Sequence, residues 1–545
     1  MKFTRYAFLF LPMLLAFHGW AQPKTPSKGK AKPSATKLVT TKSVAATPGE
    51  KVELVSANSL QGFNAPTGEA VRKFKGNVVF RQKDTYLYCD SAFQYPAANN
   101  IEAFSNVRIT QGDTVTLTGD SLYYDGNTRY ARMRGNVVMR DRAMTLTTTS
   151  VDYDMNTSVA AYYNGGRIVD KENVLTSKTG FYNTRTKLFT FKRDVKVVNP
   201  KYEVTSDTLQ YGSISRLVYL KGPSKIVGKD GTLYANDGEY NTATQVSDFR
   251  SRATVDYGRY TLTGDRLYYD KLKEIGIAEG NVESFSKKDK LMVLGDFGHY
   301  RGLEGITKVY GNALMKSVST AGDTLYLAAD TLVSVENKRD STKRVIGFNH
   351  VQIFKSDLQG KCDSLVYNFA DSTIYFFRDP VLWSAGNQME ADSMHVQMAN
   401  QKIDKMFLRV NSFVISEDSL QNHNQIKGKT LTAFFNAASN IERVLVDGNG
   451  ESLYFALDEK DSLAIGMNRV ECSKMVIRFA ENKASKISFI TKPDGLFIPP
   501  HELAEPDKRL KGFAWRIKEK PKEEAVVYRR GNRPVKIATD TALKQ

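Results

Sequence analysis

The sequence predicts an all-β fold, a long repetitive antiparallel β-jelly-roll in which units of about 29 residues each contribute two bent strands. Three observations lead to this fold class. A short residue pattern recurs along most of the 545-residue chain, each unit divides into two strand-length segments at a short turn, and the apolar alternation slips by one residue within each strand. Valine, threonine and tyrosine are abundant, as is typical of strands, and no segment of helical period interrupts the repeats.

One polar residue per unit serves as an anchor for the repeat, and Asp120 illustrates it. Leu117 lies three residues before this anchor, Gly119 one before, Leu122 two after and Tyr124 four after. The same frame fits fourteen positions: Asn58, Asp90, Asp120, Thr149, Lys178, Asp207, Asn236, Asp265, Asp296, Asp330, Asp363, Asp392, Lys429 and Ser473. A fixed period of this kind is typical of a repeat architecture.

Each unit contains two strands joined by a turn, and both strands are predicted to bend. In one unit the strands cover 116–125 and 130–141, and strands joined this closely pair antiparallel. Apolar residues lie two and four positions after the anchor, whereas strict alternation would place them one and three positions after it. A bulge or corner produces such a slip. Gly135-Asn136-Val137 marks the matching corner in the second strand, so two facing sheets joined by a crease are expected.

The apolar positions of the frame are expected to face an interior between these two sheets. The predicted lining includes Leu117, Leu122, Leu146, Val151, Leu175, Val204, Leu209, Leu233, Leu262 and Leu267. The first and last strands, near 52–58 and 475–490, are expected to be open edges with unpaired backbone groups.

Two polar ladders follow from the same period. The anchor aspartates are interpreted as a corner device, because calcium-binding solenoids use nonapeptide repeats and glycosidases need two facing carboxylates about 5 to 9 Å apart. A tyrosine recurs at a step of 29 residues at Tyr124, Tyr153, Tyr182, Tyr211, Tyr240 and Tyr269. We interpret these tyrosines as cross-strand packing, with binding of sugar or lipid as the alternative.

The residue types used by common catalytic and metal sites are scarce or scattered. Cys89, Cys362 and Cys472 all occupy the small position before an anchor, which indicates small buried residues; oxidation outside the cytoplasm is the alternative. The six histidines lie at spacings unlike those of metal ligands, and the sequence has no Walker loop, GxSxG elbow or HExxH motif. No metal, cofactor or enzymatic activity is therefore predicted.

The ends of the chain differ from the repeats. Residues 1–21 combine a basic start, an apolar run and small residues before position 22, as a signal peptide does; an uncleaved anchor is the alternative. The five predicted regions are the signal peptide 1–21, a flexible basic linker 22–50, a tightly periodic region 51–300, a looser continuation 301–490 and a Pro-containing charged tail 491–545. The tail is expected to cap the last strand, to dock on a partner or to be partly disordered.

The formal net charge of +18 is concentrated at these ends. Residues 1–50 carry seven more basic than acidic side chains, and residues 491–545 carry five more. A nucleic-acid-binding face would need a dense basic stripe on the folded body, so no nucleic-acid partner is predicted.

The units LTGDSLYYD…MRGNVVMRD and LTGDRLYYD…AEGNVESF resemble those of the OstA/LptA-like family of lipopolysaccharide-transport proteins. The resemblance is strong for residues 58–300 and weaker for 300–490. It implies a jelly roll folded like a taco, without catalysis, whose apolar groove shields lipid A acyl chains from water. The ten interior residues named above are then the candidates that line this groove.

The resemblance also implies a place and partners. It implies a periplasmic bridge that carries lipopolysaccharide toward the outer membrane and contacts inner-membrane and outer-membrane components of the transport machinery through its terminal edge strands. Head-to-tail self-association and association with the outer membrane are open. Outer-membrane members of the family carry a large barrel after the OstA-like part, and the 55 residues after position 490 are too few for one.

Two other function classes stay open at this point. One is a structural or adhesive β-solenoid of the cell surface, and the other is a solenoid enzyme that acts on polysaccharide. A lipid conduit predicts an interior wide enough for acyl chains, an adhesin predicts a packed interior with an exposed binding face, and an enzyme predicts a carboxylate pair in an outer cleft.

Overall fold

The computed structural model describes residues 50–528, except 113–114, 142–143, 171, 230, 259, 288–289, 319–321, 338–341, 385, 400–401, 437–439, 459–462 and 481–482. The predicted signal peptide, the predicted linker apart from Glu50, and residues 529–545 of the predicted tail lie outside the described residues.

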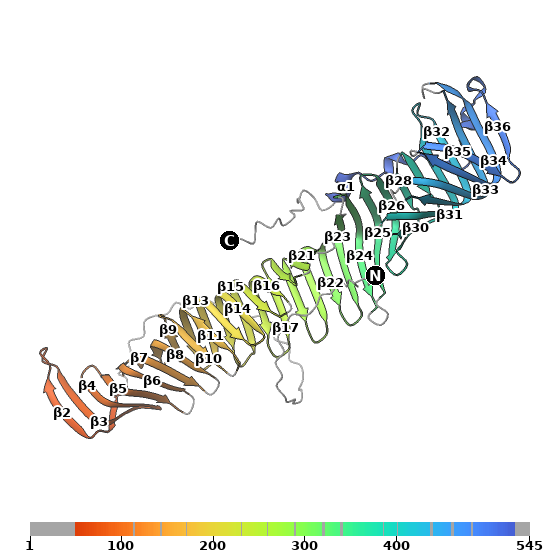
Figure 1. Cartoon of the computed structure of the whole chain (residues 1–545). Helices are drawn as coiled ribbons and strands as arrows, with labels where there is room; N and C mark the ends of the chain where they lie inside the picture. The colour runs from red at the N-terminus through yellow and green to blue at the C-terminus, as the bar shows by residue number, and fades with distance from the viewer. Residues whose placement is uncertain are drawn as a thin grey trace, which may run out of the picture. The chain divides into compact units, whose positions relative to one another are not determined.

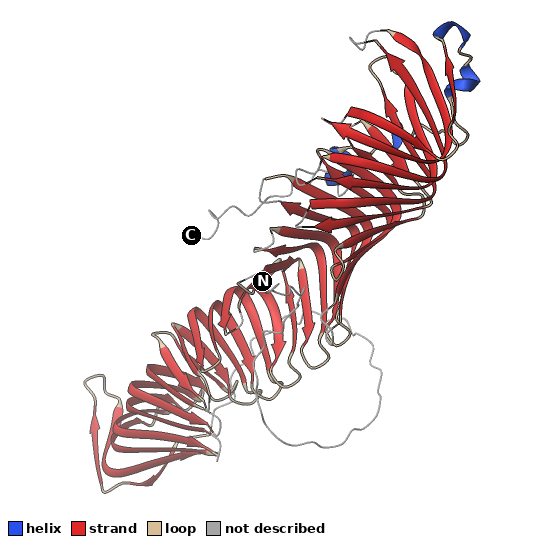
Figure 2. Ribbon diagram, turned by 45° about the vertical axis from the view of Figure 1, so that its right-hand side comes forward, coloured by secondary structure: helices blue, strands red, loops and turns tan. Residues whose placement is uncertain are grey.

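The fold is all-β, as predicted (Figures 1 and 2). It divides into two compact units. Among the described residues, the N-terminal unit comprises 50–257 and 270–272, and the C-terminal unit comprises 258–269 and 273–528. The described residues contain 36 strands, three 3-10 helices and one short α-helix. The strand pairings are antiparallel, as in neighbouring strands β5–β6 and β6–β7.

The strands up to position 257 are β1 (Glu53–Ser56), β2 (Ser59–Asn64), β3 (Ala70–Gln82), β4 (Thr85–Tyr95), β5 (Asn100–Gln111), β6 (Val115–Asp125), β7 (Tyr130–Asp141), β8 (Thr145–Asp154), β9 (Val159–Tyr162), β10 (Gly166–Val169), β11 (Val174–Ser177), β12 (Thr179–Asn183), β13 (Leu188–Asn199), β14 (Tyr202–Gly212), β15 (Leu217–Gly228), β16 (Thr232–Asn241), β17 (Val246–Arg250) and β18 (Ala253–Asp256).

The later strands are β19 (Tyr260–Gly264), β20 (Arg266–Asp270), β21 (Ile275–Ser286), β22 (Leu291–Arg301), β23 (Ile306–Val318), β24 (Thr324–Glu336), β25 (Lys343–Lys355), β26 (Leu358–Asn368), β27 (Thr373–Phe377), β28 (Val381–Ser384), β29 (Asn387–Glu390), β30 (Ser393–Ala399), β31 (Lys402–Glu417), β32 (His423–Phe435), β33 (Ile441–Leu457), β34 (Ala464–Ala480), β35 (Lys483–Ile490) and β36 (Asp494–Ile498).

The predicted corners are present as β-bulges. In the β5–β6 pair, Phe104 lies opposite Ser121 and Val107 opposite Gly119, so two residues of β5 face Asp120 alone. Those two residues, Ser105 and Asn106, have φ angles of +63° and +51°. Two consecutive left-handed residues turn the strand sharply, which explains why the sequence favours Gly-Asn at this point.

At several corners, an asparagine side chain is hydrogen-bonded to the anchor aspartate. The amide of Asn136 donates a hydrogen bond to Asp120 Oδ2 at 2.8 Å. Equivalent bonds join Asn106 to Asp90 at 2.7 Å, Asn281 to Asp265 at 2.7 Å, Asn312 to Asp296 at 3.0 Å and Asn411 to Asp392 at 3.0 Å. The interpretation of the aspartate ladder as a corner device is confirmed.

Each bent strand contributes to two layers, which we call A and B. In β6, Val115–Gly119 belongs to layer A and Ser121–Asp125 to layer B, and β7 continues both layers. Leu117 of layer A is 2% exposed and Leu122 of layer B is 3% exposed. Burying one such side chain stabilises the fold by roughly 1.5–3 kcal/mol, and the repeat multiplies this contribution along the chain.

The chain after β36 turns back over the C-terminal unit instead of ending at its last strand. It contains the 3-10 helices η1 (Pro500–Glu502), η2 (Glu505–Lys508) and η3 (Ile517–Glu519) and the helix α1 (Glu523–Val527). Leu510 packs with Phe413 and Ile415 of β31. Val414, which lies between these two residues, faces the other way and packs against the interior cluster. The segment 499–528 therefore covers the outer face of layer A.

Two buried glutamines hold this segment by its backbone. Gln425 receives a hydrogen bond from the Leu510 N–H and donates one to the Lys508 carbonyl, both at 2.8 Å. Gln388 makes the same pair of bonds to Arg516 and Ala514, both at 2.7 Å. Neither glutamine is exposed. Each side-chain amide therefore makes the hydrogen bonds that water would otherwise make to the backbone N–H and carbonyl of the segment. The described part of the tail thus docks on its own chain, and docking on a partner stays a prediction.

Candidate functional site

The interior between layers A and B of each unit is the candidate site, because the ten predicted lining residues all lie there. Their side chains are between 1% and 9% exposed, with Val151 the least and Leu175 the most exposed. All ten predicted lining residues are therefore buried. Whether acyl chains contact them stays a prediction.

The interior of the N-terminal unit is closely packed. One cavity of about 10 Å³ lies among Phe80, Leu87, Ile109 and Tyr124, and another of similar volume lies among Leu146, Ile168 and their neighbours. A cavity of about this size holds at most about one water molecule. Because the ten predicted lining residues are at most 9% exposed, acyl chains would enter between them only if the layers moved apart.

The side of the interior opposite the corners is closed by polar contacts between the layers. Tyr153 of layer B donates a hydrogen bond to Gln111 Oε1 of layer A at 2.7 Å. One unit later, Tyr182 donates to Asp141 Oδ2 at 2.5 Å, and one unit earlier Tyr124 donates to Gln82 Oε1. We call this row of three tyrosines and their three partners the seam.

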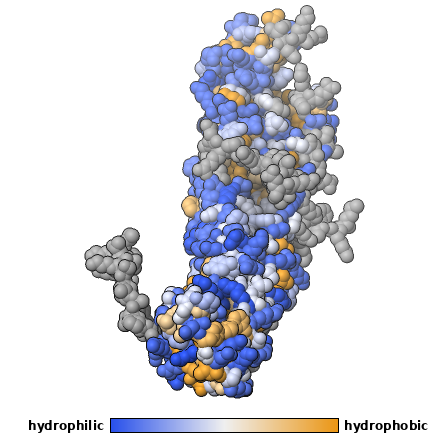
Figure 3. Space-filling view, turned by 90° about the vertical axis from the view of Figure 1, so that its left-hand side faces the viewer, coloured by the Kyte–Doolittle hydropathy of each residue, from blue (hydrophilic) through white to orange (hydrophobic). Residues whose placement is uncertain are grey.

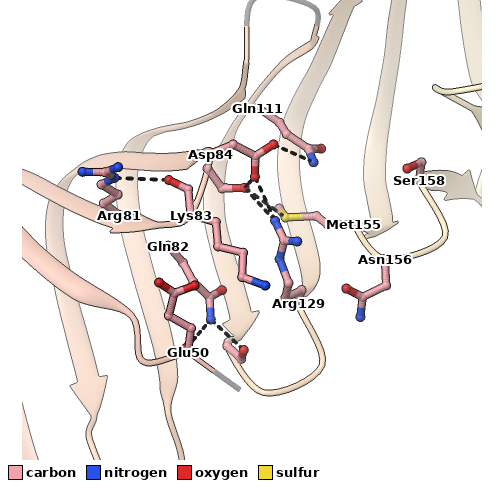
Figure 4. A network of polar contacts seen from close by, with 12 residues as sticks. Glu50, Arg81, Gln82, Lys83, Asp84, Gln111, Arg129, Met155, Asn156 and Ser158 are labelled. Carbon is pink, nitrogen blue, oxygen red and sulfur yellow. Dashed lines mark hydrogen bonds and ion pairs between the residues drawn. The ribbon is translucent and has the colours of Figure 1, made fainter. Parts of the chain in front are cut away.

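Two cations extend the seam. Arg129 lies 3.1 Å from Asp84, and Gln111 donates a hydrogen bond to the other oxygen of the same carboxylate at 3.4 Å. Figure 4 shows Asp84 between these two side chains. Lys187 lies 2.6 Å from Asp141, whose side chain is only 6% exposed. Two groups of contacts result: one links Tyr153, Gln111, Asp84 and Arg129, and the other links Tyr182, Asp141 and Lys187.

The seam phenols are held in the protonated, donating form. Burial raises the pKa of Tyr124 and Tyr153. Burial and the Asp141 carboxylate raise the pKa of Tyr182. The hydroxyls therefore remain donors at neutral pH, and the seam does not depend on a group that titrates there.

The tyrosine ladder thus does more than the packing predicted for it. Tyr240 shows packing alone, because its buried hydroxyl has no hydrogen-bond partner among the described residues. The sequence held a signal that was missed: the layer A strands that face Tyr124, Tyr153 and Tyr182 end in Gln82, Gln111 and Asp141 at inward positions where an apolar residue is expected.

Both ends of the fold expose apolar edge strands. In the N-terminal unit, β1 and β2 both pair with β3, and Leu54, Val55, Leu60 and Phe63 are 41–61% exposed. Hydrophobic side chains gather at the end of the molecule in Figure 3 that carries these strands. In the C-terminal unit, β35 and β36 both pair with β34. The prediction that the edge begins at Met475 is wrong, because Met475 lies in β34 and pairs on both sides.

The cysteines are small buried residues, as predicted. Cys89, Cys362 and Cys472 are buried and free. Burial raises the pKa of the Cys89 and Cys362 thiols to about 12, so they are poor nucleophiles. No helix within the described residues is long and apolar enough to cross a membrane.

Comparisons with known proteins agree with the repeat. Residues 49–207 and 204–265 match the family model described as OstA-like protein. A similar solved structure is LptH from Pseudomonas aeruginosa, described as the LptA-homologous periplasmic component of the conserved lipopolysaccharide transport device. It is 21% identical over 25% of this chain and 81% of that chain, with a TM-score of 0.14. No curated protein matches the chain. The family-model match alone confirms the resemblance, over residues 49–265.

Proposed function

We propose that this protein is a periplasmic lipopolysaccharide-transport protein, which holds lipid A acyl chains between layers A and B and bridges part of the way to the outer membrane. The observation that carries the proposal is the OstA-like match over a repeat that buries apolar side chains from both layers at every unit. Apolar contacts are non-directional, so a repeated interior offers a sliding acyl chain a similar environment at each step. We propose no catalytic step.

The proposal is tested by the lipids that purify with the native protein. Mass spectrometry of lipids extracted from protein isolated from its own periplasm is expected to find lipid A-containing species in about stoichiometric amounts. A protein with the same tag but without the repeats, isolated in parallel, controls for carry-over. Absence of lipid A species from the repeat protein would remove the proposed function.

The exposed edge strands are the proposed contacts with neighbouring proteins of the transport machinery. An edge strand with unpaired backbone groups accepts a further strand. Photocrosslinkers at Val55 in β1 and Phe497 in β36, which are 56% and 49% exposed, are expected to capture different neighbours in cells. Capture of another copy of this chain at both positions would instead indicate head-to-tail self-association.

The packed interior favours a second candidate, a structural or adhesive β-solenoid of the cell surface. In that case, the interior serves stability alone and the outer face carries the function. The two candidates differ in the lipid extraction above and in location: fractionation is expected to find the transport protein in the periplasm, and an adhesin on the outer surface where external protease reaches it.

A further inference from the structure

The two layers of the N-terminal unit are joined along two lines of different chemistry. On the corner side, bent strands such as β6 and β7 run without interruption from one layer into the other. On the opposite side, no strand crosses between the layers in these pairings, and the polar contacts there include the side-chain bonds of the seam, from Tyr124–Gln82 to Tyr182–Asp141. Side-chain bonds exchange for bonds to water or to a ligand, whereas a covalent strand does not break.

We propose that the seam is the gate of the acyl-chain site. The layers hinge at the corners and part at the seam, and an acylated amphiphile loads sideways, with its chains between Tyr153 and Gln111 and its headgroup outside. This inference rests on the proposed function and adds the route of loading. It reconciles a closely packed interior with a lipid ligand, because cavities of about 10 Å³ exclude acyl chains while the seam is closed.

The chemistry of the seam suits repeated opening. A typical hydrogen bond between side chains changes an equilibrium by only about 2- to 10-fold, because water replaces the lost partner. The three tyrosines repeat at a step of 29 residues, so a chain that moves along the interior meets a similar latch at each unit.

The ligand class follows from the charges along the same line. When the seam opens, Arg129 leaves Asp84 and Lys187 leaves Asp141. The layer B edge of the opening then carries these two cations, and the layer A edge carries the two carboxylates. Arg and Lys pair well with phosphate, so the layer B edge is the side that would receive a phosphate group. The gate therefore fits a phosphorylated, multiply acylated lipid better than a neutral one.

A cleavable crosslink across the seam is the direct test. Cysteines replace Gln111 and Tyr153 in a full-length chain that also carries Cys89→Ala, Cys362→Ala and Cys472→Ala, since other units have alanine in that slot. A disulfide-containing bismaleimide then joins the two new thiols. The control joins Asp120 and Asn136 at the corner, which also contact one another, at 2.8 Å.

Uptake of fluorescent lipid A is measured for each protein, with deacylated lipid A as the ligand control. The seam crosslink is expected to reduce uptake at least 10-fold, reduction of the linker to restore it, and the corner crosslink to change it less than 2-fold. Equal uptake with the seam closed, or equal loss from the corner crosslink, would overturn the gate. Failure of the uncrosslinked parent to bind lipid A would contradict the proposed function itself.

Single hydroxyl deletions test the gate without a crosslinker. Tyr153→Phe and Tyr182→Phe each remove one seam bond and are expected to raise the initial rate of lipid A uptake about 2- to 10-fold. Tyr240→Phe is the matched control, because the buried hydroxyl of Tyr240 makes no hydrogen bond within the described part of the chain. A gate is contradicted if the three variants take up lipid at the same rate.

Discussion

At the scale of single residues, the anchor position accepts chemically different side chains, because the residue that contacts it at the corner differs from unit to unit. Asp120 receives a hydrogen bond from Asn136, and Asp330 contacts His350 at 2.7 Å. At Lys178 the charges are reversed, and the partner is Asp194 at 2.5 Å. A sequence pattern that looks for aspartate alone would miss this unit, whereas the geometry of the corner includes it.

The reversed pair gives a direct test of the corner device. Lys178→Asp is expected to lower the free energy of unfolding of the N-terminal unit by about 0.5–1 kcal/mol, because two carboxylates then meet at an exposed corner. The double variant Lys178→Asp with Asp194→Lys is expected to regain that loss. Urea denaturation measures both, and a double variant no better than the single one would contradict the pairing.

The interior residues give the second test at this scale. Leu122→Asp places a carboxylate at a position that is 3% exposed and is expected to destabilise the unit by about 3 kcal/mol or more. If the variant folds, its photocrosslinking to lipid A falls at least severalfold. Thr116→Asp is the control, since Thr116 lies on the same strand between the inward Val115 and Leu117. Equal lipid capture by both variants would contradict the interior assignment.

At the scale of elements, sequence reasoning gave the strands and corners but neither the seam nor the docked C-terminal segment. The strands follow from a local period, and Gly-Asn marks the corners at Gly135 and Gly280. The seam joins residues 41–42 positions apart, such as Tyr153 and Gln111, and no local pattern links them. The apolar residues of the segment 499–528 follow no period, so its contacts with β31 and β32 could not be predicted from the sequence.

The docked segment is expected to stabilise the C-terminal unit. Gln425→Ala leaves the Leu510 N–H and the Lys508 carbonyl unpaired under a buried surface and is expected to cost about 2–3 kcal/mol. Hydrogen exchange of residues 505–516 measures the loss of docking. Gln397→Ala, on the partly exposed strand β30, is the control. Unchanged exchange in Gln425→Ala would show that the amide does not hold the segment.

Docking of the same segment is expected to weaken in acid. Arg516 donates hydrogen bonds to Asp379, at 2.6 Å, and to Glu519, at 2.8 Å. The hydrogen bond from Arg516, aided by Lys361, lowers the pKa of Glu519 to about 2, and the Arg516 hydrogen bond also lowers the pKa of Asp379. Both carboxylates therefore stabilise docking fully above about pH 4.5, and the stabilisation is lost as the pH falls toward 2.

Glu390 acts in the opposite direction and has to be separated from this effect. Burial raises its pKa above the ordinary value of 4.5, so its protonation relieves a buried charge as the pH falls. Hydrogen exchange of 508–520 in Arg516→Gln isolates the contribution of the arginine. The variant is expected to exchange faster at neutral pH and to depend less on pH than the wild-type chain. Identical pH dependence in both would contradict the assignment.

At the scale of the whole molecule, the account joins a repeat that buries apolar side chains to an OstA-like sequence over residues 49–265. The repeat explains why the fold class and the interior residues were predictable from the sequence alone. The width of the interior was not predictable, because it depends on how closely side chains from two layers interlock. In this structure they interlock tightly, so the proposed binding of acyl chains requires the layers to move.

Lipid capture from inside the fold tests this central claim most directly. p-Benzoylphenylalanine replaces Phe80 in one variant and Tyr88 in the other. Phe80 is fully buried and lines the small cavity of the interior. Tyr88 lies on the neighbouring strand β4, where the Arg108 guanidinium covers its ring on the outer face. After irradiation in cells, the account predicts an adduct with lipid A at position 80 and little or none at position 88. An adduct at neither position, or equal adducts at both, would contradict it.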